Sequence, residues 1–318
     1  KLSLPIFKFL ILTNIADQSI KNFLRLLHSS EEENVALALE MAKGIPECNV
    51  IVQDYVTLTQ CFFDKKVKQL RAAHITNLNN SYLTIKNKKN LIIPPAIRQL
   101  SYLESIRFAD YTIDEFPDEM GELQKLWDVS LSSNQFTTLP LKLAKFKNIR
   151  HLVIEHNDYR ILPEGIQQFQ FLKHLGLEHV RLAQLPAEIG ELTHLEGLSF
   201  YNNFLIALPA EIGKLSKLKV LNLAYNPLQW LPPSIGQLTQ LENLDLSYNR
   251  ITDLPAEFAQ LQNLTRLVLR NNELEKLPPV LKHLKNLREI YLGNNPLPAN
   301  EKSKLKEWLP DCDMYRTN

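Results

Sequence analysis

The chain has 318 residues, and its 36 lysines and arginines nearly balance its 35 aspartates and glutamates, which gives a formal net charge of +1. Nucleic acids and anionic membranes attract proteins with a basic excess, so this balance favours neither kind of partner. Hydrophobic residues make up 45% of the sequence, enough for a large core. No apolar run reaches the roughly 18 residues of a membrane-spanning helix. We therefore expect a folded protein with no nucleic-acid partner and no membrane span.

The most apolar stretch near the start of the chain is residues 4–12, which Lys8 interrupts. No small-residue cleavage site follows it, so a buried strand or helix is favoured over the remnant of a secretion signal. The sequence is compatible with a cytoplasmic protein and with a secreted one.

The first 80 residues predict a helical amino-terminal cap. Ile20, Phe23 and Leu27 have helical spacing. Ser30 and Glu33 fit a capping box that would begin a second helix, and Gly44 and Pro46 would stop it. A third helical stretch is expected within residues 53–74. A solenoid needs a cap over its first repeat, and a separate adaptor function is the alternative for this region.

From about residue 80 onward the sequence repeats with a period of 23 residues. Proline marks the period at Pro94, Pro117, Pro140, Pro163, Pro186, Pro209, Pro232, Pro255 and Pro278. Asparagine keeps the same period at Asn134, Asn157, Asn203, Asn226, Asn249, Asn272 and Asn295. One unit reads Leu241-x-x-Leu244-x-Leu246-x-x-Asn249-x-Ile251-x-x-Leu254-Pro255.

The spacing within one unit explains how the units stack. Leu244 and Leu246 are two residues apart, so on an extended chain both side chains point the same way and can pack against the leucines of the neighbouring units. The asparagine follows the strand, where its amide can bond unpaired backbone groups of the turn. The proline fixes an extended start for the opposite side. About ten strands are expected, centred near residues 84, 107, 130, 153, 176, 199, 222, 245, 268 and 291.

Three units carry the same Leu-Pro-x-x-Ile-Gly-x-Leu segment, at Leu185–Leu192, Leu208–Leu215 and Leu231–Leu238. With the repeated prolines, this pattern resembles the leucine-rich-repeat family in its 23-residue form. Residues 295–312 look like the helical end cap of bacterial members, and the cysteine-rich caps usual in extracellular animal and plant members are absent. The resemblance implies a bacterial origin.

The resemblance also implies an α/β fold, a curved horseshoe-shaped solenoid with parallel strands on its concave side. We expect a helical amino-terminal cap over residues 1–80, repeats over 81–298 and a short helical carboxy-terminal cap over 299–318. Some repeats depart from the consensus, because Lys88, Tyr111 and Val180 stand where asparagine is expected. Cys48, Cys61 and Cys312 are odd in number and widely spaced, which argues against a disulfide framework and a zinc ribbon.

Strand positions that alternate with the inward leucines should form columns across the concave face, with neighbours about 4.8 Å apart. Two adjacent repeats place matched polar residues in these columns: His151, Glu155 and His156, then His174, Glu178 and His179. Adjacent carboxylates repel, which favours a bound cation or a basic partner. However, His151 and Glu155 should lie roughly 13 Å apart along a strand, too far to share one ion. A patch that binds a polar partner is therefore preferred over a metal site.

Later repeats place further candidate contacts on or beside the same face. Tyr201, Tyr225 and Tyr248 are typical interface anchors, or they lie over the turns that follow the strands. Arg266 and Arg270 can receive a carboxylate or pair with acidic neighbours such as Glu289. Trp230 marks a second contact if it is exposed, or packs under the convex turn. Ser247 is expected on the open face and Leu223 in the core.

We interpret the chain as a non-enzymatic module that binds a protein or peptide partner on the concave face. The candidate contact residues are His151, Glu155, His156, His174, Glu178, His179, Tyr201, Tyr225, Tyr248, Arg266 and Arg270. The alternative is a receptor for a glycan or another small or polymeric ligand, with a cation at the histidine and glutamate patch. The sequence has no glycine-rich phosphate loop, paired-cysteine metal motif or Gly-x-Ser-x-Gly elbow, so we expect no catalytic residue, metal or cofactor.

Overall fold

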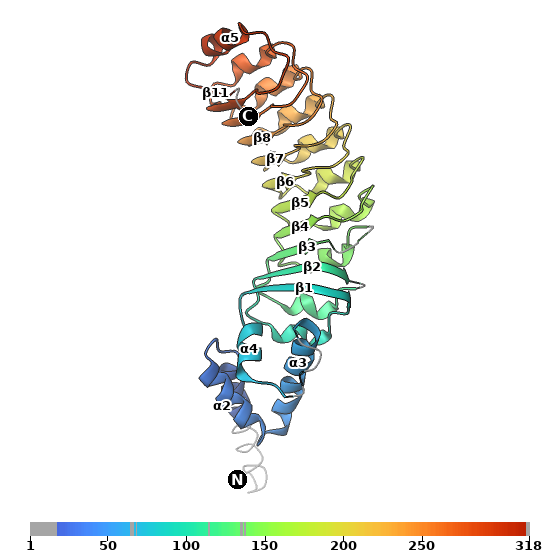
Figure 1. The fold of residues 1–318 in the computed structure, drawn as a ribbon, viewed down its shortest axis with the longest axis vertical. Coiled ribbons are helices and arrows are strands. Elements are labelled where there is room, and N and C mark those ends of the chain that lie inside the picture. Colours follow the sequence, from blue (N-terminus) through green and yellow to red (C-terminus); the bar gives the residue numbers. More distant parts are fainter. Residues whose placement is uncertain are drawn as a thin grey trace, which may run out of the picture. The chain divides into compact units, whose positions relative to one another are not determined.

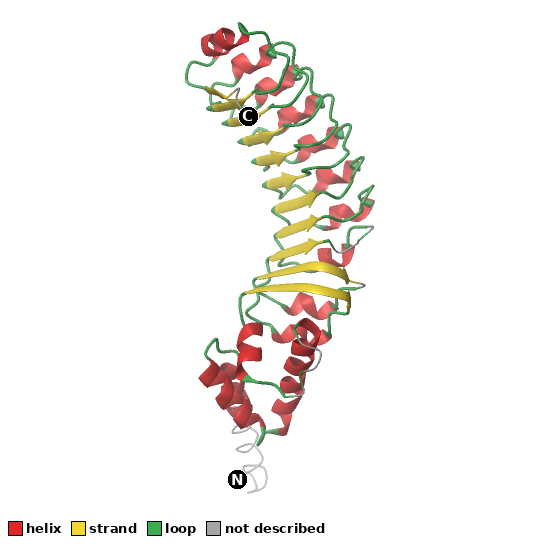
Figure 2. Cartoon of the chain, in the orientation of Figure 1, coloured by secondary structure: helices red, strands yellow, loops and turns green. Residues whose placement is uncertain are grey.

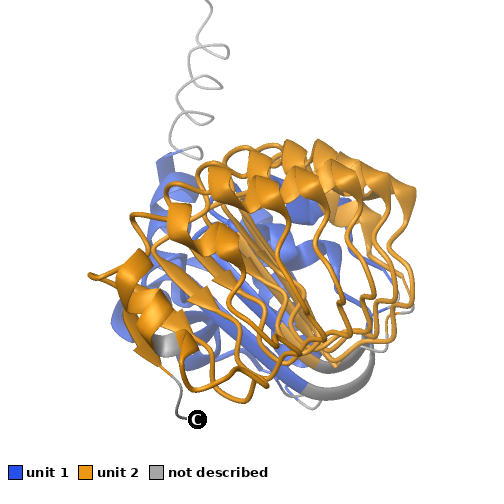
Figure 3. Cartoon of the chain, turned by 90° about the horizontal axis from the view of Figure 1, so that it is seen from above, with its two compact units in different colours: residues 1–107, 113–127 blue, residues 108–112, 128–318 orange. Residues whose placement is uncertain are grey.

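The structure, a computed structural model, describes residues 18–63, 67, 69–113, 115–133, 136 and 138–315. The apolar stretch at residues 4–12 and Asn134 lie outside the described residues, as do the side chains of Lys88 and Tyr111. The chain forms two compact units (Figure 3): unit 1 comprises residues 1–107 and 113–127, and unit 2 comprises residues 108–112 and 128–318. The sequence-based boundaries near residues 80 and 298 stay predictions.

Unit 1 begins with helices, as its sequence predicts. Residues 18–27 are helical, and α2 (Glu32–Ala42), α3 (Pro46–Phe62) and α4 (Ala72–Leu78) follow (Figure 1). Strand β1 (Tyr82–Leu91) and the 3-10 helices η1 (Pro95–Gln99) and η2 (Asp118–Glu122) complete this unit, while β2 (Ser105–Ile113) has residues in both units. The helices share a core in which Phe23, Leu27, Val35, Leu58 and Ile75 are fully buried.

The predicted capping box at Ser30 and Glu33 is wrong. Helix α2 begins at Glu32, and its N-cap residue Glu31 makes no side-chain cap hydrogen bond. The hydroxyl of Ser29 instead accepts hydrogen bonds from the Glu31 backbone N–H at 3.1 Å and from the Asn34 side chain at 3.1 Å. Helix α2 ends at Ala42, just before Gly44 and Pro46, as predicted. Pro46 also starts α3, where its missing N–H costs nothing because the first helical N–H groups have no partner in the helix.

Unit 2 is a series of parallel strands, each paired with the strands of the neighbouring repeats. The strands are β3 (Asp128–Ser132), β4 (His151–Glu155), β5 (His174–Glu178), β6 (Gly197–Ser199), β7 (Val220–Asn222), β8 (Asn243–Asp245), β9 (Arg266–Val268), β10 (Glu289–Tyr291) and β11 (Asp313–Tyr315). Within this unit the strands line the inner side of the curve (Figure 2).

Short 3-10 helices lie on the outer side of the curve, and each follows the proline of its repeat (Figure 2). They are η3 (Leu141–Lys145), η4 (Glu164–Gln168), η5 (Ala187–Glu191), η6 (Ala210–Lys214), η7 (Pro233–Gln237), η8 (Ala256–Gln260) and η9 (Pro279–His283). Pro209 and Pro255 are the N-cap residues of their helices, with extended ψ angles of 152° and 153°. Proline therefore begins an extended entry to η4–η8, as expected, whereas the ψ angles of Pro140 and Pro278 are smaller, at 83° and 124°.

The leucines between these two layers form the core of unit 2. Leu244 and Leu246 are 1% and 0% exposed, and Leu221 and Leu267 are 0% exposed. Each such leucine stabilises the unit by roughly 1.5–3 kcal/mol through burial. Because each repeat packs against the next one, the core runs through the whole series.

The repeated asparagine joins successive repeats through its side-chain amide. The Asn226 amide nitrogen donates hydrogen bonds to the carbonyls of Phe200 at 3.0 Å, Leu223 at 3.0 Å and Ala224 at 3.2 Å. Its side-chain oxygen accepts from the Leu205 N–H of the preceding repeat at 3.0 Å. The asparagine period therefore supplies partners to backbone groups buried in the turn.

The carboxy-terminal end contains one predicted element and one that was not predicted. Helix α5 (Glu301–Trp308) is the expected helical cap, and buried Glu301 accepts a hydrogen bond from the Leu277 N–H at 2.8 Å. Strand β11 then adds an unexpected parallel strand to β10, with Ile290 opposite Met314. None of the described helices is long and apolar enough to span a membrane.

Candidate functional site

The strands β4 and β5 bring the predicted histidine and glutamate residues together. Their register places His151 beside His174 and Glu155 beside Glu178. The two histidine rings meet edge to face, with 5.5 Å between their centroids. The matched columns read from the sequence therefore exist on the open face of the sheet.

An acidic residue of the preceding strand also belongs to this cluster. The Asp128 carboxylate pairs with Nδ1 of His151, and strand pairing places the two residues opposite each other. On the other side, the His174 ring lies so close to Gly197 that a Cβ would not fit there. Burial, then the neighbouring His151, lowers the pKa of His174. The sequence analysis missed Asp128 because it considered this column only from His151 onward.

The two glutamates bond to serine hydroxyls of the flanking strands. Ser132 donates to Glu155 at 3.2 Å, and Ser199 donates to Glu178 at 2.6 Å. Each carboxylate thus gains a neutral donor from the strand away from the other carboxylate, which reduces the need for a bound cation between them. Within the described part of the chain, no group of three or more His, Cys, Asp or Glu side chains is placed to hold a metal ion.

Aromatic side chains form a continuous row where the strands end. We call this row, made of His156, His179, Tyr201, Tyr225 and Tyr248, the aromatic row. Its adjacent ring centroids are separated by 4.5, 5.2, 5.2 and 4.0 Å in this order. The first and last pairs are stacked, and the two central pairs meet edge to face. The structure thus joins five predicted contact residues into one surface feature.

Most of the aromatic row stands on left-handed backbone. The φ angles of His156, His179, Tyr225 and Tyr248 are 52°, 53°, 58° and 55°. Bulky residues rarely adopt this region because the side chain crowds the backbone. Hydrogen bonds to the next repeat hold it here, such as the Tyr225 N–H to the Ser247 carbonyl at 2.9 Å. These four residues stand in the bends that follow the strands.

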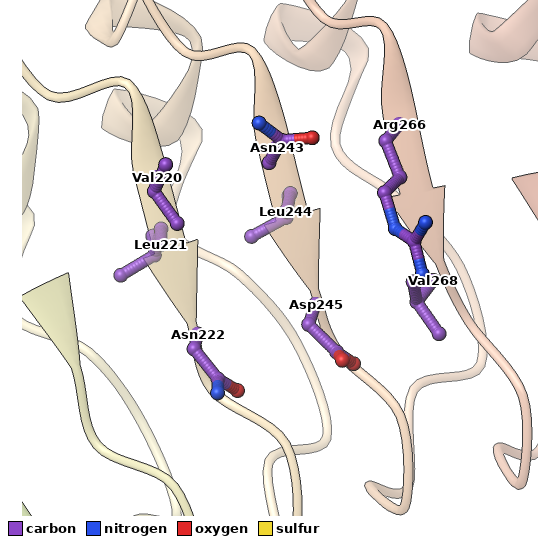
Figure 4. A pocket seen from close by; sticks show the side chains of 8 residues that line it. All are labelled: Val220, Leu221, Asn222, Asn243, Leu244, Asp245, Arg266 and Val268. Atoms are coloured by element: carbon purple, nitrogen blue, oxygen red, sulfur yellow. The ribbon is translucent and has the colours of Figure 1, made fainter. Parts of the chain in front are cut away.

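Two adjoining hollows run across the concave face. One, of about 290 Å³, is lined by side chains of β4–β7 that include His174, Glu178, Ser199, Val220 and Asn222. The other, of about 250 Å³, is lined by Val220, Leu221, Asn222, Asn243, Leu244, Asp245, Arg266 and Val268 (Figure 4). They share Val220 and Asn222, so we treat them together as the concave groove. Val220 is 44% exposed within it.

The groove residues Val220, Asn222 and Asn243 were missed because the sequence analysis selected charged and aromatic positions. They occupy the same columns as His151 and Val153, so complete columns were the available signal. Figure 4 shows that three neighbouring strands together contribute apolar, amide and charged side chains to this hollow.

The two predicted arginines have different surroundings. Arg266 pairs with Glu289 at 2.8 Å, and its guanidinium lies over the Tyr291 ring at 4.7 Å. The guanidinium of Arg270 lies 5.7 Å from the centroid of Tyr248, at the end of the aromatic row. Among the described residues no carboxylate forms an ion pair with Arg270, and its buried Nε has no hydrogen-bond partner. Arg266 is therefore neutralised within the chain, and Arg270 is not.

The expectation that Ser247 lies on the open face is wrong. Its residue is only 1% exposed, and its hydroxyl donates to the Asp245 carboxylate at 2.6 Å. The same carboxylate oxygen accepts the Ser247 backbone N–H at 2.8 Å. The chain is already turning at this position, so the small side chain folds back under the turn.

Trp230 is exposed to 57%, which excludes the interpretation that it is packed under the convex turn. Phe204 and Ile206 of the preceding repeat are exposed to 58% and 63%. The sequence analysis missed these two residues, although buried Leu205 between them is consistent with their outward direction.

Comparisons with known proteins agree with the repeat architecture. Residues 209–307 match the family model described as a leucine-rich repeat region. The structure resembles an internalin from Listeria monocytogenes with a TM-score of 0.58 and 18% identity, over 74% of this chain and 68% of the internalin. The comparison with curated protein sequences gave no match.

Two further solved structures share the fold. One is the leucine-rich-repeat ectodomain of the plant membrane receptor kinase GASSHO1/SCHENGEN3 from Arabidopsis thaliana, in complex with Casparian strip integrity factor 2. It is 29% identical with a TM-score of 0.54, over 70% of this chain and 28% of that chain. The other, a TLR13–ssRNA13 complex, is 23% identical with a TM-score of 0.59, over 67% of this chain and 32% of that chain. Because that complex contains RNA, the fold gives no support to the expected absence of a nucleic-acid partner.

Proteins with this architecture are generally binding modules without enzymatic activity. The repeated leucines, the asparagine amides that join the turns, the parallel strands and the comparisons all agree. The repeats of unit 2 therefore have the fold of a leucine-rich-repeat solenoid, and residues 209–307 match the leucine-rich repeat region itself.

Proposed function

We propose that this protein is a non-enzymatic binding module whose concave groove receives a protein or peptide partner. The observation that carries the proposal is the pair of adjoining hollows, of about 290 and 250 Å³, which share Val220 and Asn222. Together they reach from β4 to β9 on the face of the sheet that the 3-10 helices leave uncovered.

The groove offers the kinds of contact that a peptide uses. Val220 supplies apolar surface for a side chain of the partner. The side-chain amides of Asn222 and Asn243 can both donate to and accept from a peptide backbone. The side-chain oxygen of Asn222 accepts a hydrogen bond from the Ala224 N–H at 3.0 Å, which fixes the orientation of this amide. Such a mixture of apolar anchors and oriented polar groups is typical of binding sites.

The geometry favours a peptide over a glycan. Sugars stack on the open faces of aromatic rings, but the faces of Tyr225 and Tyr248 cover each other, with 4.0 Å between centroids. A hydrogen bond with Tyr248 raises the pKa of Tyr225, so these hydroxyls also interact with each other. The aromatic row therefore presents ring edges to a partner, which suits polar contacts along its rim.

Site-specific photo-crosslinking tests the proposal. A photoreactive amino acid replaces Val220 in the groove or, as a control, Lys282 on η9, and the full chain is irradiated in an extract of the source organism. We expect a defined protein adduct from position 220 only, identified by mass spectrometry, which is lost when Asn222→Arg fills the groove. Adducts from position 282 alone, or adducts that persist with Asn222→Arg, would place the binding surface elsewhere.

A further inference from the structure

The charges along the concave groove are distributed unevenly. Glu178 lies towards the β5 end, and Arg270 follows β9 just beyond the groove lining. Between them, β6 and β7 present the uncharged Ser199, Val220 and Asn222. Strand β8 presents the Asp245 carboxylate, which accepts hydrogen bonds from the Ser247 N–H and hydroxyl. The groove is therefore acidic at the β5 end and uncharged over β6 and β7, and a basic side chain follows where β9 ends.

The carboxylate of Glu178 is available to a cationic group. It lines the hollow and accepts one hydrogen bond, from the Ser199 hydroxyl at 2.6 Å. Among the described residues no lysine or arginine forms an ion pair with it. The nearest ionisable groups of the same hollow are His151, which pairs with Asp128, and His174. His174 and Glu178 stand at opposite ends of β5, so the histidine ring does not neutralise the carboxylate.

The guanidinium of Arg270 is available to an anionic group. Its buried Nε has no hydrogen-bond partner, although an unsatisfied buried donor on a charged group is costly. The neighbouring Arg266 differs, because Glu289 neutralises it at 2.8 Å. A partner carboxylate at the guanidinium of Arg270 would balance its charge.

The strand spacing sets the distance between these two charges. β5 and β9 are four strand intervals apart, and at about 4.8 Å per interval they lie about 19 Å from each other. An extended peptide advances about 3.3 Å per residue, so about six residues cover this distance.

We propose that the groove recognises an extended peptide segment with a basic residue at Glu178 and an acidic residue about six positions away at Arg270. An apolar side chain between these two residues rests on Val220. This inference rests on the proposed function and adds the charge pattern of the partner, since each end of the segment meets its opposite charge.

Selection from a phage-displayed library of random dodecapeptides on the full chain tests the inference. The expected enriched peptides carry Lys or Arg and Asp or Glu about six positions apart, with an apolar residue between them. A selected synthetic peptide should bind about tenfold more weakly to Glu178→Lys and to Arg270→Glu. Its affinity for each variant should recover when the corresponding peptide charge is reversed. Lys282→Glu, a charge reversal on η9, should leave the affinity unchanged.

The outcomes separate this inference from the proposed function. Peptides that lose binding with Asn222→Arg, but show neither the charge pattern nor recovery on charge reversal, would overturn the inference and leave the proposed function standing. Peptides that still bind Asn222→Arg, or a selection without enrichment, would contradict both. Thermal unfolding of each variant and the conservative pair Glu178→Gln and Arg270→Lys distinguish loss of charge from loss of fold.

Discussion

The two faces of the sheet in unit 2 differ in how far they repeat. The buried position is the same residue in three successive strands, Leu221, Leu244 and Leu267. The position immediately before it, which faces the groove, changes completely: Val220, Asn243 and Arg266. Stacked repeats require complementary side chains only where they contact one another, so the buried face maintains the fold while the open face is free to carry specificity.

The largest expected effect is on the buried face. Leu223→Ala removes a fully buried side chain between two repeats and should lower the free energy of unfolding by roughly 2–5 kcal/mol, because it leaves a cavity that neighbours cannot fill. Val220→Ala, on the groove face, should change it by no more than about 0.5 kcal/mol. Urea unfolding followed by circular dichroism measures both variants. Equal losses would mean that the two faces are assigned the wrong way round.

The next effect concerns the amides that join the repeats. Asn226→Ala removes the donor to three carbonyls and the acceptor of the Leu205 N–H, all in a buried turn. Leaving such groups unsatisfied should cost about 1–3 kcal/mol or more. Asn243→Ala in the groove is the matched control and should be nearly neutral in the same urea experiment. A neutral Asn226→Ala would show that water replaces the amide.

The sequence predicted the features that depend on repetition. The leucine, asparagine and proline spacing placed the repeat strands, and the strand register then brought His151 to His174 and Glu155 to Glu178. Strand β11 was not predicted because it lacks the paired leucines and does not keep the 23-residue period. Its Asp313 lies opposite Glu289, 24 residues earlier in the chain. The hydrogen bond that the Ser29 hydroxyl accepts from the Glu31 N–H, and the one that Ser247 donates to Asp245, depend on local backbone geometry. The repeat spacing carries no information about that geometry.

The candidate site was predicted less completely than the fold. Charged and aromatic side chains stand out in a sequence, but a groove is defined by what surrounds an empty space. Val220 and Asn222 line both hollows although neither residue type is unusual on a strand. The aromatic row likewise depends on left-handed turns at non-glycine residues, which the sequence pattern gave no reason to expect.

A smaller effect tests the strain under the aromatic row. Tyr248 has a φ of 55°, a value that glycine adopts without steric strain and alanine does not. Tyr248→Ala and Tyr248→Gly both lose the stacking on Tyr225, but the alanine variant should be less stable than the glycine variant by about 1 kcal/mol. At Tyr201, which does not have a positive φ, the order should reverse. The same order at both positions would contradict the assignment of strain to the turn.

The smallest expected effect is on the pH dependence of stability, and on the groove face it comes from His174. Burial and the neighbouring His151 lower the pKa of His174 from the ordinary value of 6.5. As pH falls below about 6.5, the unfolded chain therefore binds a proton that the folded chain resists, and the free energy of unfolding decreases until His174 also titrates in the folded state. Burial also lowers the pKa of His28 in unit 1, which adds a decrease in the free energy of unfolding of the same sign.

Urea unfolding between pH 7.5 and 5 measures this effect. As the pH is lowered, the urea midpoint of His174→Gln should fall less steeply than that of the unchanged chain. His28→Gln should remove a separate part of the pH-dependent decrease. If His174→Gln leaves the slope unchanged, the ring is solvated enough to titrate normally.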